Sequence, residues 1–417
     1  MALPIRLLAE PRRKRQMIVE KEYTEGRTTF LSADVEHYSG DKKQISANLP
    51  VFYNPRMKLN RDISVLLLSG YLEGNNIESM CEPLTGSGVR TLRYLNECPG
   101  DFSATMFDAN PAAVETATKN IKQLGFEKRA KVVKGDAKLL LMTESREKRF
   151  DYVDVDPFGT PAPYLNASIQ SISPTGGLLA LTATDMPVLC GAYPKVAMRR
   201  YGGFSIRAPF VHELAVRLLE AITFRIAGLN DCSMTPITVL STDHYVRTWV
   251  KIKADRKKSN READNLGVIR YCQGCMRTQT IPLKVKHEES HFEHDIKDCK
   301  GPVREAGPLW IGSLFDSKIL KKTLDLFTKD DERVYHKRVP RILDEMIEEN
   351  SLMPYPYIDI HVLCDLYNLT PPKNRDVIEY LRNAGYKVAR THFKPTAIRT
   401  DASVIDVKLA ISELTGR

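Results

Sequence analysis

The segment Asp156-Pro157-Phe158-Gly159 brings a carboxylate and an aromatic ring together in a turn. An aromatic ring can stack on a nucleobase, and a carboxylate beside it can accept a hydrogen bond or a proton from an exocyclic amine. Asp-Pro also opens turns in many proteins, so the tetrapeptide alone is a weak signal. Its meaning depends on the elements that precede it and on the reaction partner that they could hold.

Alternating sequence patterns predict the elements that position this segment. From about residue 77 to residue 250, short apolar runs alternate with helix-like stretches, which predicts an α/β fold with a parallel sheet covered on both faces. The run 150–156 alternates apolar and polar residues, and we interpret it as a half-buried strand ending at Asp156. The expected strands are 77–82, 103–108, 131–135, 150–156, 177–183, 237–241 and 248–252, and the expected helices include 111–125 and 212–226.

A glycine pair follows the first expected strand, in the segment from Glu82 to Arg90. Gly86 and Gly88 allow a tight turn and a close approach of the backbone to a ligand, with a helix beginning just after them. The third glycine of the dinucleotide-binding fingerprint is missing, because Val89 follows. The pair alone also fits an ordinary strand-to-helix turn.

Two carboxylates strengthen the case for a ligand. Asp108 ends the second expected strand, where a carboxylate can accept hydrogen bonds from ribose hydroxyls. Asp136 follows the third expected strand, where it could accept an amino proton of adenine. Each residue alone also suits a turn or a helix cap. Loops at successive carboxyl ends of parallel strands converge on one crevice, so the sequence predicts a nucleoside-containing cofactor there.

The choice of cofactor lies between NAD and S-adenosylmethionine. The glycine pattern is incomplete, and the loop that begins at Asp156 suits chemistry on an amine. A dehydrogenase would need a hydride-transfer site, for which the sequence offers no candidate. We therefore expect S-adenosylmethionine.

Composition places the chain in a broad class. Its 417 residues allow two or three domains, and 42% apolar and 27% charged residues are typical of globular proteins. There is neither an apolar run of roughly 18 residues nor a signal-peptide pattern, so we expect a cytoplasmic protein with reduced cysteines and no membrane contact. The net charge of +9 fits either a basic solvated surface or a polyanionic partner such as nucleic acid.

Cysteines and histidines gather in the second half of the chain. Cys272-x-x-Cys275 has zinc-knuckle spacing, and His294 and Cys299 could complete a structural Cys3His site. His291 is an alternative fourth ligand, with Asp295 and Asp298 as weaker ones. A redox motif is disfavoured because no thioredoxin-like context surrounds it, and unpaired reduced cysteines remain the plain alternative.

Composition also divides the chain. The polar stretch 253–265 reads as an exposed connector. We expect a catalytic domain over 1–253 and an RNA-binding domain over 254–417, which includes a zinc-ribbon-like segment at 270–310. After the charged helices 320–327 and 338–350, the pattern of helices 358–366 and 374–384 followed by a basic hairpin suggests a small α+β module that grips a phosphate backbone, although these charges also fit a solvated face.

Several motifs, in this order along the chain, resemble the tRNA (guanine-26-N2)-dimethyltransferases of archaeal type. The resemblance extends from about residue 17 to residue 405, and the recurrence of many motifs makes it specific. The matching segments are Val51-Phe52-Tyr53-Asn54-Pro55, Leu59-Asn60-Arg61-Asp62, the Gly86/Gly88 loop ending in Arg90, Asp156-Pro157-Phe158-Gly159, Gly307-Pro308-Leu309-Trp310-Ile311-Gly312 and Arg390-Thr391-His392-Phe393.

The resemblance implies a Rossmann-like, S-adenosylmethionine-dependent methyltransferase domain with a smaller C-terminal α+β RNA-binding domain, acting as a monomer on tRNA. It implies one or two methyl groups added to the exocyclic N2 of guanine 26. Carried over residue by residue, it places Arg61, Arg90, Asp108, Asp136 and Ala137, with Glu82 and Gly86, at the cofactor; Asp156 as the catalytic carboxylate; and Phe52 and Phe158 beside the guanine.

Elementary chemistry agrees with these implied roles. The guanidinium of Arg61 suits the cofactor's carboxylate, although a structural pair with Asp62 or another acid is the alternative. Phe52 would also fit core packing before a turn. Two other functions stay open from the residues alone: an amino-methyltransferase acting on another guanine or an adenine, and an inactive RNA-binding module on a methyltransferase fold.

Overall fold

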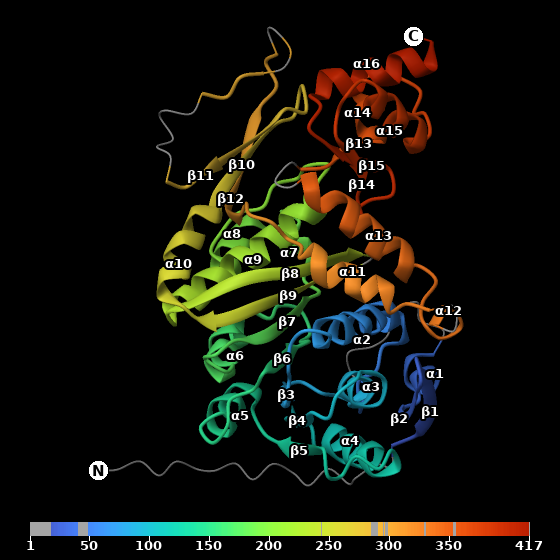
Figure 1. Cartoon of the computed structure of the whole chain (residues 1–417), viewed down its shortest axis with the longest axis vertical. Coiled ribbons are helices and arrows are strands. Elements are labelled where there is room, and N and C mark those ends of the chain that lie inside the picture. Colours follow the sequence, from blue (N-terminus) through green and yellow to red (C-terminus); the bar gives the residue numbers. More distant parts are fainter. Residues whose placement is uncertain are drawn as a thin grey trace.

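A seven-stranded sheet lies at the centre of the computed structural model (Figure 1). The structure describes residues 18–40, 49–242, 244–284, 291–294, 296, 299–328, 331–352 and 356–416. The strands lie in the order β5-β4-β3-β6-β7-β9-β8, and only β9 runs antiparallel to its neighbours. Their bounds are β3 Ser79–Glu82, β4 Ser103–Asp108, β5 Ala130–Lys134, β6 Tyr152–Val155, β7 Gly177–Ala183, β8 Cys232–Thr242 and β9 Tyr245–Ala254.

The strand order fixes where a ligand can bind. The chain passes from β3 outward to β4 and β5, and then returns to place β6 on the other side of β3. The reversal makes the carboxyl ends of β3 and β6 a topological switch point, the place at which open α/β sheets bind ligands. The expected parallel sheet is thus confirmed, and the loops after β3, β4, β5 and β6 all open at one edge.

Helices pack against the sheet and begin where the local sequence favours a start. α4 (Pro111–Gln123) has Asn110 as its N-cap and proline at its first position, and α5 (Ala137–Glu144) is capped by Asp136. α9 (Val211–Leu229) packs on β8 and β9 with its apolar face. Further helices of this half are α2 Lys58–Leu72, α3 Val89–Glu97, α6 Leu165–Ser171, α7 Met186–Leu189 and α8 Pro194–Tyr201.

Two interpretations of the sequence were wrong in detail. The strand that ends before Asp156 is not half-buried: every residue of β6 is buried, because β6 lies between β3 and β7 with helices over the sheet. The stretch 253–265 is not a plain connector, since α10 (Arg256–Glu262) forms there behind the N-cap Asp255 and packs on β8. Its outward face is nevertheless exposed, which is why its composition resembles a linker.

The second half of the chain contains two smaller sheets. β10 (Leu266–Cys272) pairs with β11 (Thr278–Pro282) and β12 (Val303–Trp310) in a sheet that we call the ribbon sheet. A terminal sheet follows in the order β13-β15-β14, and the expected basic hairpin is its β14–β15 pair. Further bounds are α11 Ser317–Asp325, α12 Asp331–Val334, α13 Val339–Glu349, β13 Ile358–Asp359, α14 Ile360–Tyr367, α15 Asn374–Asn383, β14 Val388–Arg390, β15 Ala397–Thr400 and α16 Val404–Thr415.

A buried ion network joins this half to the central sheet's helices. Arg399 on β15 lies between Glu213 of α9 and Glu349 of α13, with Nη2 2.9 Å from a carboxylate oxygen of each. All three side chains are buried. Arg399 belongs to the hairpin that the sequence analysis interprets as a basic, phosphate-gripping module, but it is a buried link, while Lys387 and Arg390 of the same hairpin are exposed.

An N-terminal hairpin, β1 (Glu20–Glu25) and β2 (Thr28–Ala33), is followed by α1 (Val35–Ser39), and β2 packs on α3 and α4.

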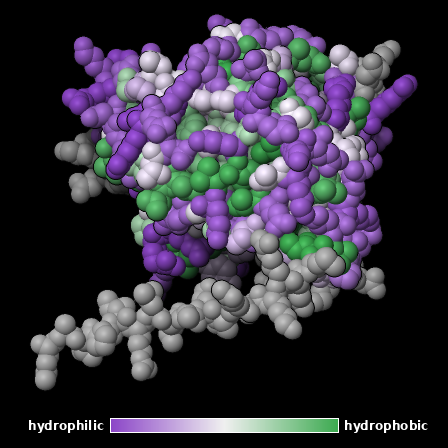
Figure 2. Space-filling view, turned by 90° about the horizontal axis from the view of Figure 1, so that it is seen from below, coloured by the Kyte–Doolittle hydropathy of each residue, from purple (hydrophilic) through white to green (hydrophobic). Residues whose placement is uncertain are grey.

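Viewed from the end of the molecule where β5 and α4 lie, the surface is mainly hydrophilic around a band of hydrophobic residues (Figure 2). Within the described ranges, none of the helices is both long enough and apolar enough to cross a membrane.

Candidate cofactor and catalytic site

The loop 156–159, here called the catalytic loop for its predicted role, begins directly after β6. Asp156 is the first residue beyond the strand end, its side chain is 23% exposed, and its Oδ2 accepts a hydrogen bond from Nη2 of Arg90. Gly159 adopts a φ of 77°, a conformation that favours glycine. Its N–H donates to Oγ1 of Thr184 and its carbonyl accepts from the Thr184 N–H, both at 2.8 Å. The loop is therefore fixed at both ends, to Arg90 and to the segment after β7.

Arg90 is buried among acids at the centre of the site. Besides Asp156, its Nε lies 3.9 Å from Glu82 and 3.9 Å from Asp154, and its Nη1 donates to Oγ of Ser64 at 3.2 Å. Burial disfavours the charged guanidinium, but Asp156 and Asp154 outweigh it and hold the pKa of Arg90 well above its ordinary value. In this structure, Arg90 holds the carboxylate of Asp156 in place.

Glu82 secures the turn between β3 and the glycine loop. Its Oε2 accepts hydrogen bonds from Oγ1 of Thr85 at 2.9 Å and from Oγ1 of Thr91 at 2.6 Å. Burial raises the pKa of the Glu82 carboxyl to about 7. Glu82 therefore connects β3, the glycine loop and α3 by hydrogen bonds at the switch point.

The glycine loop is shaped by close contacts. The N–H of Gly86 donates to Oδ2 of Asp108 at 2.9 Å, which joins the ends of β3 and β4. Gly86 has a φ of 54°, and a Cβ atom there would lie 2.9 Å from the carbonyl oxygen of Phe52. Gly88 is the N-cap of α3 and supplies no side-chain cap, so the first N–H groups of α3 remain available to an anionic ligand group.

The other two sequence-predicted acids lie at this edge of the sheet. Oδ1 of Asp108 accepts from the N–H of Asn110 at 2.8 Å. Asp136 is exposed and caps α5, because its Oδ1 accepts from the N–H groups of Lys138 and Leu139, each at 3.0 Å. Ala137 is the buried first residue of that helix. Asp136 thus acts as the helix cap that we weighed against a cofactor contact, and its second oxygen is not needed for the cap.

Two aromatic rings from distant segments meet beside the catalytic loop. The ring centroids of Phe52 and Phe158 are 4.4 Å apart with an interplanar angle of 80°, an edge-to-face contact. Phe158 is 61% exposed, whereas Phe52 is half-buried between the buried residues Val51 and Tyr53. The rings touch each other, so a base could border them as they stand, or lie between them after they separate.

Arg61 lies apart from this cluster of contacts. Its Nε donates to Glu25 at 2.7 Å and its Nη2 donates to the carbonyl of Asn54 at 2.9 Å and to Glu25. Burial opposes the charge on Glu25, but Arg61 outweighs it and lowers the pKa of that carboxyl. Here Arg61 forms the structural pair with an acid that we weighed against a cofactor contact.

The sequence interpretation did not include Asp154 and its partner Arg247. Oδ2 of Asp154 accepts from Nη2 of Arg247 at 2.6 Å and from the hydroxyls of Tyr94 and Tyr152, each at 2.7 Å. These groups are buried next to Arg90, so its guanidinium has charged neighbours on the buried side. An acid in the middle of a central strand was the available signal, because a strand buried on both faces cannot leave a carboxylate unpaired.

The four proposed zinc ligands come together at the end of the ribbon sheet. The ligand atoms of Cys272, Cys275, His294 and Cys299 all lie within 4.8 Å of one another. The sulfur atoms of Cys272 and Cys299 are 3.7 Å apart, close to the roughly 3.8 Å that tetrahedral zinc with 2.3 Å zinc–sulfur bonds requires. His291 does not belong to this cluster, and Asp295 and Asp298 lie outside the described residues.

The backbone around the cluster favours thiolates. The N–H of Gly274 points at the sulfur of Cys272 at 3.3 Å, and the N–H of Gly301 points at the sulfur of Cys299 at 3.5 Å. Burial raises the pKa of the Cys272 thiol, but hydrogen bonds from the backbone N–H groups of Cys275 and Gly274 outweigh it and lower that pKa. The four residues therefore fit a structural zinc ion with a closed set of protein ligands.

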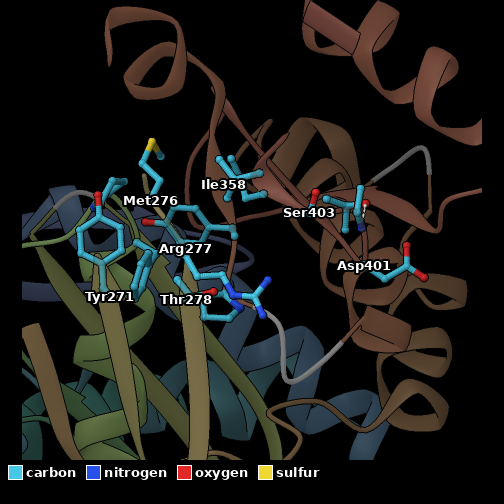
Figure 3. A pocket seen from close by; sticks show the side chains of 14 residues that line it. Tyr271, Met276, Arg277, Thr278, Ile358, Asp401 and Ser403 are labelled. Atoms are coloured by element: carbon cyan, nitrogen blue, oxygen red, sulfur yellow. Dashed lines mark hydrogen bonds between the residues drawn. The ribbon is translucent and has the colours of Figure 1, made fainter. Parts of the chain in front are cut away.

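A hollow of about 200 Å³ lies between the ribbon sheet and the terminal sheet (Figure 3). Arg277 and Thr278 line it from one side, and Ile358, Asp401 and Ser403 line it from the other. None of the residues predicted to bind the cofactor or the guanine lines this hollow. We therefore do not assign the cofactor to it.

The residues at the switch point fit S-adenosylmethionine. The Oγ atom of Ser87 in the glycine loop is buried without a hydrogen-bond partner among the described residues, and α3 begins beside it without a side-chain cap. Asp108 and Asp136 offer carboxylate oxygens at the neighbouring strand ends. With the strand order and the adjoining carboxylate–aromatic loop, these features define a Rossmann-like methyltransferase that acts on an amine.

Comparisons with known proteins identify the family. The family model of N2,N2-dimethylguanosine tRNA methyltransferases matches residues 27–411, so the chain belongs to this family. A tRNA (guanine(26)-N(2))-dimethyltransferase of Methanosphaera stadtmanae is 36% identical over 382 residues, covering 90% of this chain and 94% of that one. The one of Methanothermobacter thermautotrophicus is 33% identical over 388 residues, covering 90% and 96%.

Among solved structures, Trm1 from Pyrococcus horikoshii in complex with S-adenosyl-L-methionine superposes with a TM-score of 0.77. It is 28% identical, and the match covers 94% of this chain and 99% of that one. The predicted fold class and family are therefore confirmed, and the chain is an S-adenosylmethionine-dependent enzyme. The roles of individual residues stay predictions.

Substituting Gly86 tests the shape of the glycine loop. Gly86→Ala adds a Cβ atom 2.9 Å from the carbonyl oxygen of Phe52 at a φ of 54°, so we expect the affinity for S-adenosylmethionine to fall about tenfold or more, or roughly 1.4 kcal/mol. Gly125→Ala is the matched control, because its φ of 72° gives similar strain in open space. Calorimetric titration that gave equal affinities for both variants would contradict the assignment.

Proposed function

We propose that the chain transfers one or two methyl groups from S-adenosylmethionine to the exocyclic N2 of guanine 26 in tRNA, with Asp156 as the catalytic carboxylate. Membership of the N2,N2-dimethylguanosine tRNA methyltransferase family supports the reaction. The observation that carries the role of Asp156 is its position. It is partly exposed at the switch point, fixed by Arg90, and flanked by the exposed ring of Phe158.

The residues at the switch point would hold the cofactor in distinct ways. Asp108 would accept hydrogen bonds from the ribose hydroxyls, and Asp136 with Ala137 would contact the adenine. Gly86 lets the backbone approach the ligand, and the uncapped start of α3 would bind an anionic group. When bound, S-adenosylmethionine supplies an electrophilic methyl group on its sulfonium. Arg90 and Glu82 would support this site from the buried side.

Asp156 would activate the guanine amine. The N2 lone pair is delocalised into the ring and is a weak nucleophile. Among the described contacts only Oδ2 of Asp156 is engaged, by Arg90, so Oδ1 can accept a hydrogen bond from the amine. The carboxylate then takes the proton as the carbon–nitrogen bond forms, an effect of about 100- to 10,000-fold. A monomethylated amine still has one N–H, so the same step can be repeated.

The guanine must leave its stack in the tRNA to reach Asp156. Extrusion of a base costs a few kcal/mol, and stacking on an aromatic side chain offsets part of that cost. Phe158 is suited to this role because its ring is exposed next to the carboxylate, whereas Phe52 supports it from the edge. Holding the amine in line with the methyl group adds the benefit of orientation.

Replacing Phe158 tests this stacking role. Phe158→Ala should lower kcat/KM for tRNA about 5- to 150-fold, because base–aromatic stacking contributes about 1–3 kcal/mol. Phe158→Tyr keeps the ring and should restore most of the activity. Methyl transfer to an unmodified tRNA transcript at saturating S-adenosylmethionine measures both variants. Equal activity of the alanine and tyrosine variants would contradict a stacking role.

The second half of the chain would hold the tRNA. We propose residues 1–253 as the catalytic domain and 254–417 as the tRNA-binding domain, with zinc bound by Cys272, Cys275, His294 and Cys299 keeping the ribbon sheet in shape. The exposed cations of the β14–β15 hairpin suit contacts with phosphate. We further propose that the protein acts as a monomer in the cytoplasm, without membrane contact.

One alternative is tested in the same system. An amino-methyltransferase for another guanine or an adenine would use the same loop but modify another position of the tRNA.

A further inference from the structure

The helix α8 presents an exposed face beside the catalytic loop. Lys195, Met198 and Arg199 lie at positions i, i+3 and i+4 of this helix, which places them on one side. Tyr193 precedes the helix as its N-cap residue. Tyr193 is 57% exposed and Met198 is 37% exposed, and both cations are exposed as well. We call these four residues the α8 surface.

The inner face of α8 is anchored at the end of β7. Oδ1 of Asp185 accepts a hydrogen bond from the hydroxyl of Tyr201 at 2.6 Å, and its Oδ2 accepts from Nη1 of Arg200 at 3.1 Å. Ala197 and Tyr201 are buried, and α8 packs against α9 (Figure 1). The helix therefore has one face fixed to the methyltransferase fold and the opposite face turned to solvent.

A short chain of contacts links the α8 surface to Asp156. Gly159 of the catalytic loop makes two hydrogen bonds with Thr184, the residue immediately before Asp185: its N–H donates to the Thr184 hydroxyl, and its carbonyl accepts from the Thr184 N–H. Thus the loop that holds the catalytic carboxylate and the segment that anchors α8 meet at the same edge of the sheet. The segment that anchors α8 therefore adjoins the loop that begins at Asp156.

The charge of the segment selects the kind of partner. Residues 186–207 contain one lysine and three arginines but no acidic residue. Arg200 is paired with Asp185, whereas Lys195 and Arg199 point outward with a tyrosine and a methionine beside them. Cations that neutralise phosphates, together with an aromatic ring on which a base can stack, are the components of a single-strand nucleic-acid surface.

We propose that the α8 surface binds the tRNA strand beside the guanine that enters the active site. Lys195 and Arg199 contact phosphates of this strand, and Tyr193 stacks on a nucleotide next to the extruded guanine. Recognition of the tRNA is thus shared between the second half of the chain and the catalytic half. This inference rests on the proposed function, since it names how the substrate of that same site is held.

A pair of charge-reversal variants tests this proposal. In K195E/R199E we expect the KM for an unmodified tRNA transcript to rise about tenfold or more. We also expect the slope of log KM against log salt concentration to decrease by about 1 to 2. K122E/K128E is the control, because it reverses two exposed cations that lie in the proposed catalytic domain and not in the proposed tRNA-binding domain. Lys122 is in the last turn of α4, and Lys128 follows that helix just before β5 begins, so the control lies at the sheet edge away from Asp156.

The aromatic part has its own variants. Tyr193→Ala should raise the KM about fivefold or more, and Tyr193→Phe should restore it, since only the ring is needed for stacking. Unchanged calorimetric binding of S-adenosylmethionine establishes that each variant is folded.

The possible results separate this inference from the proposed function. If the wild-type chain methylates guanine 26 and K195E/R199E behaves like K122E/K128E, the α8 surface does not bind tRNA and the inference is overturned. The inference is also overturned if K195E/R199E changes the oligomeric state while its KM stays unchanged, because the surface then contacts a second copy of the chain. If the wild-type chain does not modify guanine 26 at all, it is the proposed function that fails.

Discussion

Asp156→Asn is expected to reduce turnover about 100- to 10,000-fold while the affinity for S-adenosylmethionine stays nearly unchanged. Asparagine keeps the shape of the side chain and can still accept a hydrogen bond from Arg90, but it cannot take the amine proton. The buried guanidinium of Arg90 remains flanked by Glu82 and Asp154, so the variant should stay folded. Single-turnover methyl transfer and calorimetric binding measure the two quantities.

Asp108→Asn is the contrasting variant for this experiment. Asp108 also ends a strand at the same edge, but its oxygens hold the glycine loop and face the proposed ribose position. We expect it to weaken S-adenosylmethionine binding while turnover at saturating cofactor stays closer to that of the wild type. Near-normal turnover in Asp156→Asn would refute Asp156 as the proton acceptor.

Loss of a zinc ligand should have the second large effect. Cys275→Ser removes one of four ligand atoms, so we expect the bound zinc to be lost and the ribbon sheet to be strongly destabilised. Structural zinc contributes an apparent 10–16 kcal/mol in small zinc-finger peptides, about as much as the whole stability of a typical domain. Metal analysis of the purified protein and thermal unfolding with and without a chelator report the two effects.

Two matched variants sharpen the zinc experiment. Cys232→Ser changes a half-buried cysteine whose thiol donates to the carbonyl of Asn230, outside the cluster, and should retain the metal. His294→Ala should lose the metal, whereas His291→Ala should keep it, because only His294 lies with the cysteines among the described residues. A wild-type protein that contains no zinc, or whose unfolding temperature a chelator leaves unchanged, would contradict the metal assignment.

Local patterns were sufficient to predict much of the fold. The bounds predicted for β4 and β7 coincide with Ser103–Asp108 and Gly177–Ala183, because these apolar runs are flanked by polar or turn-forming residues. The burial of β6 was not predicted, since alternating residues resemble a strand with one solvated face. Its polar residue Asp154 is stabilised by Arg247, which lies 93 positions away in the sequence. No local pattern contains such a pairing.

In the site, too, some contacts could be predicted from the sequence and others could not. The meeting of Gly86 with Asp108 follows from the rule that neighbouring parallel strands end at one edge, and the structure has that hydrogen bond. The partners of the two arginines did not follow from any such rule. Arg61 pairs with Glu25 of the N-terminal hairpin, and Arg90 faces acids from two strands and the catalytic loop. Which acid meets which arginine depends on the packed fold.

Position-resolved mass spectrometry of a tRNA substrate tests the central claim most directly. An unmodified tRNA transcript is incubated with the purified chain and S-adenosylmethionine, then digested and mapped, beside a transcript with adenosine in place of guanosine 26. The account predicts N2-methylguanosine and N2,N2-dimethylguanosine at position 26 of the first transcript and no methylated nucleoside in the second. Methylation at another position, on adenine, or equally in both transcripts would contradict it.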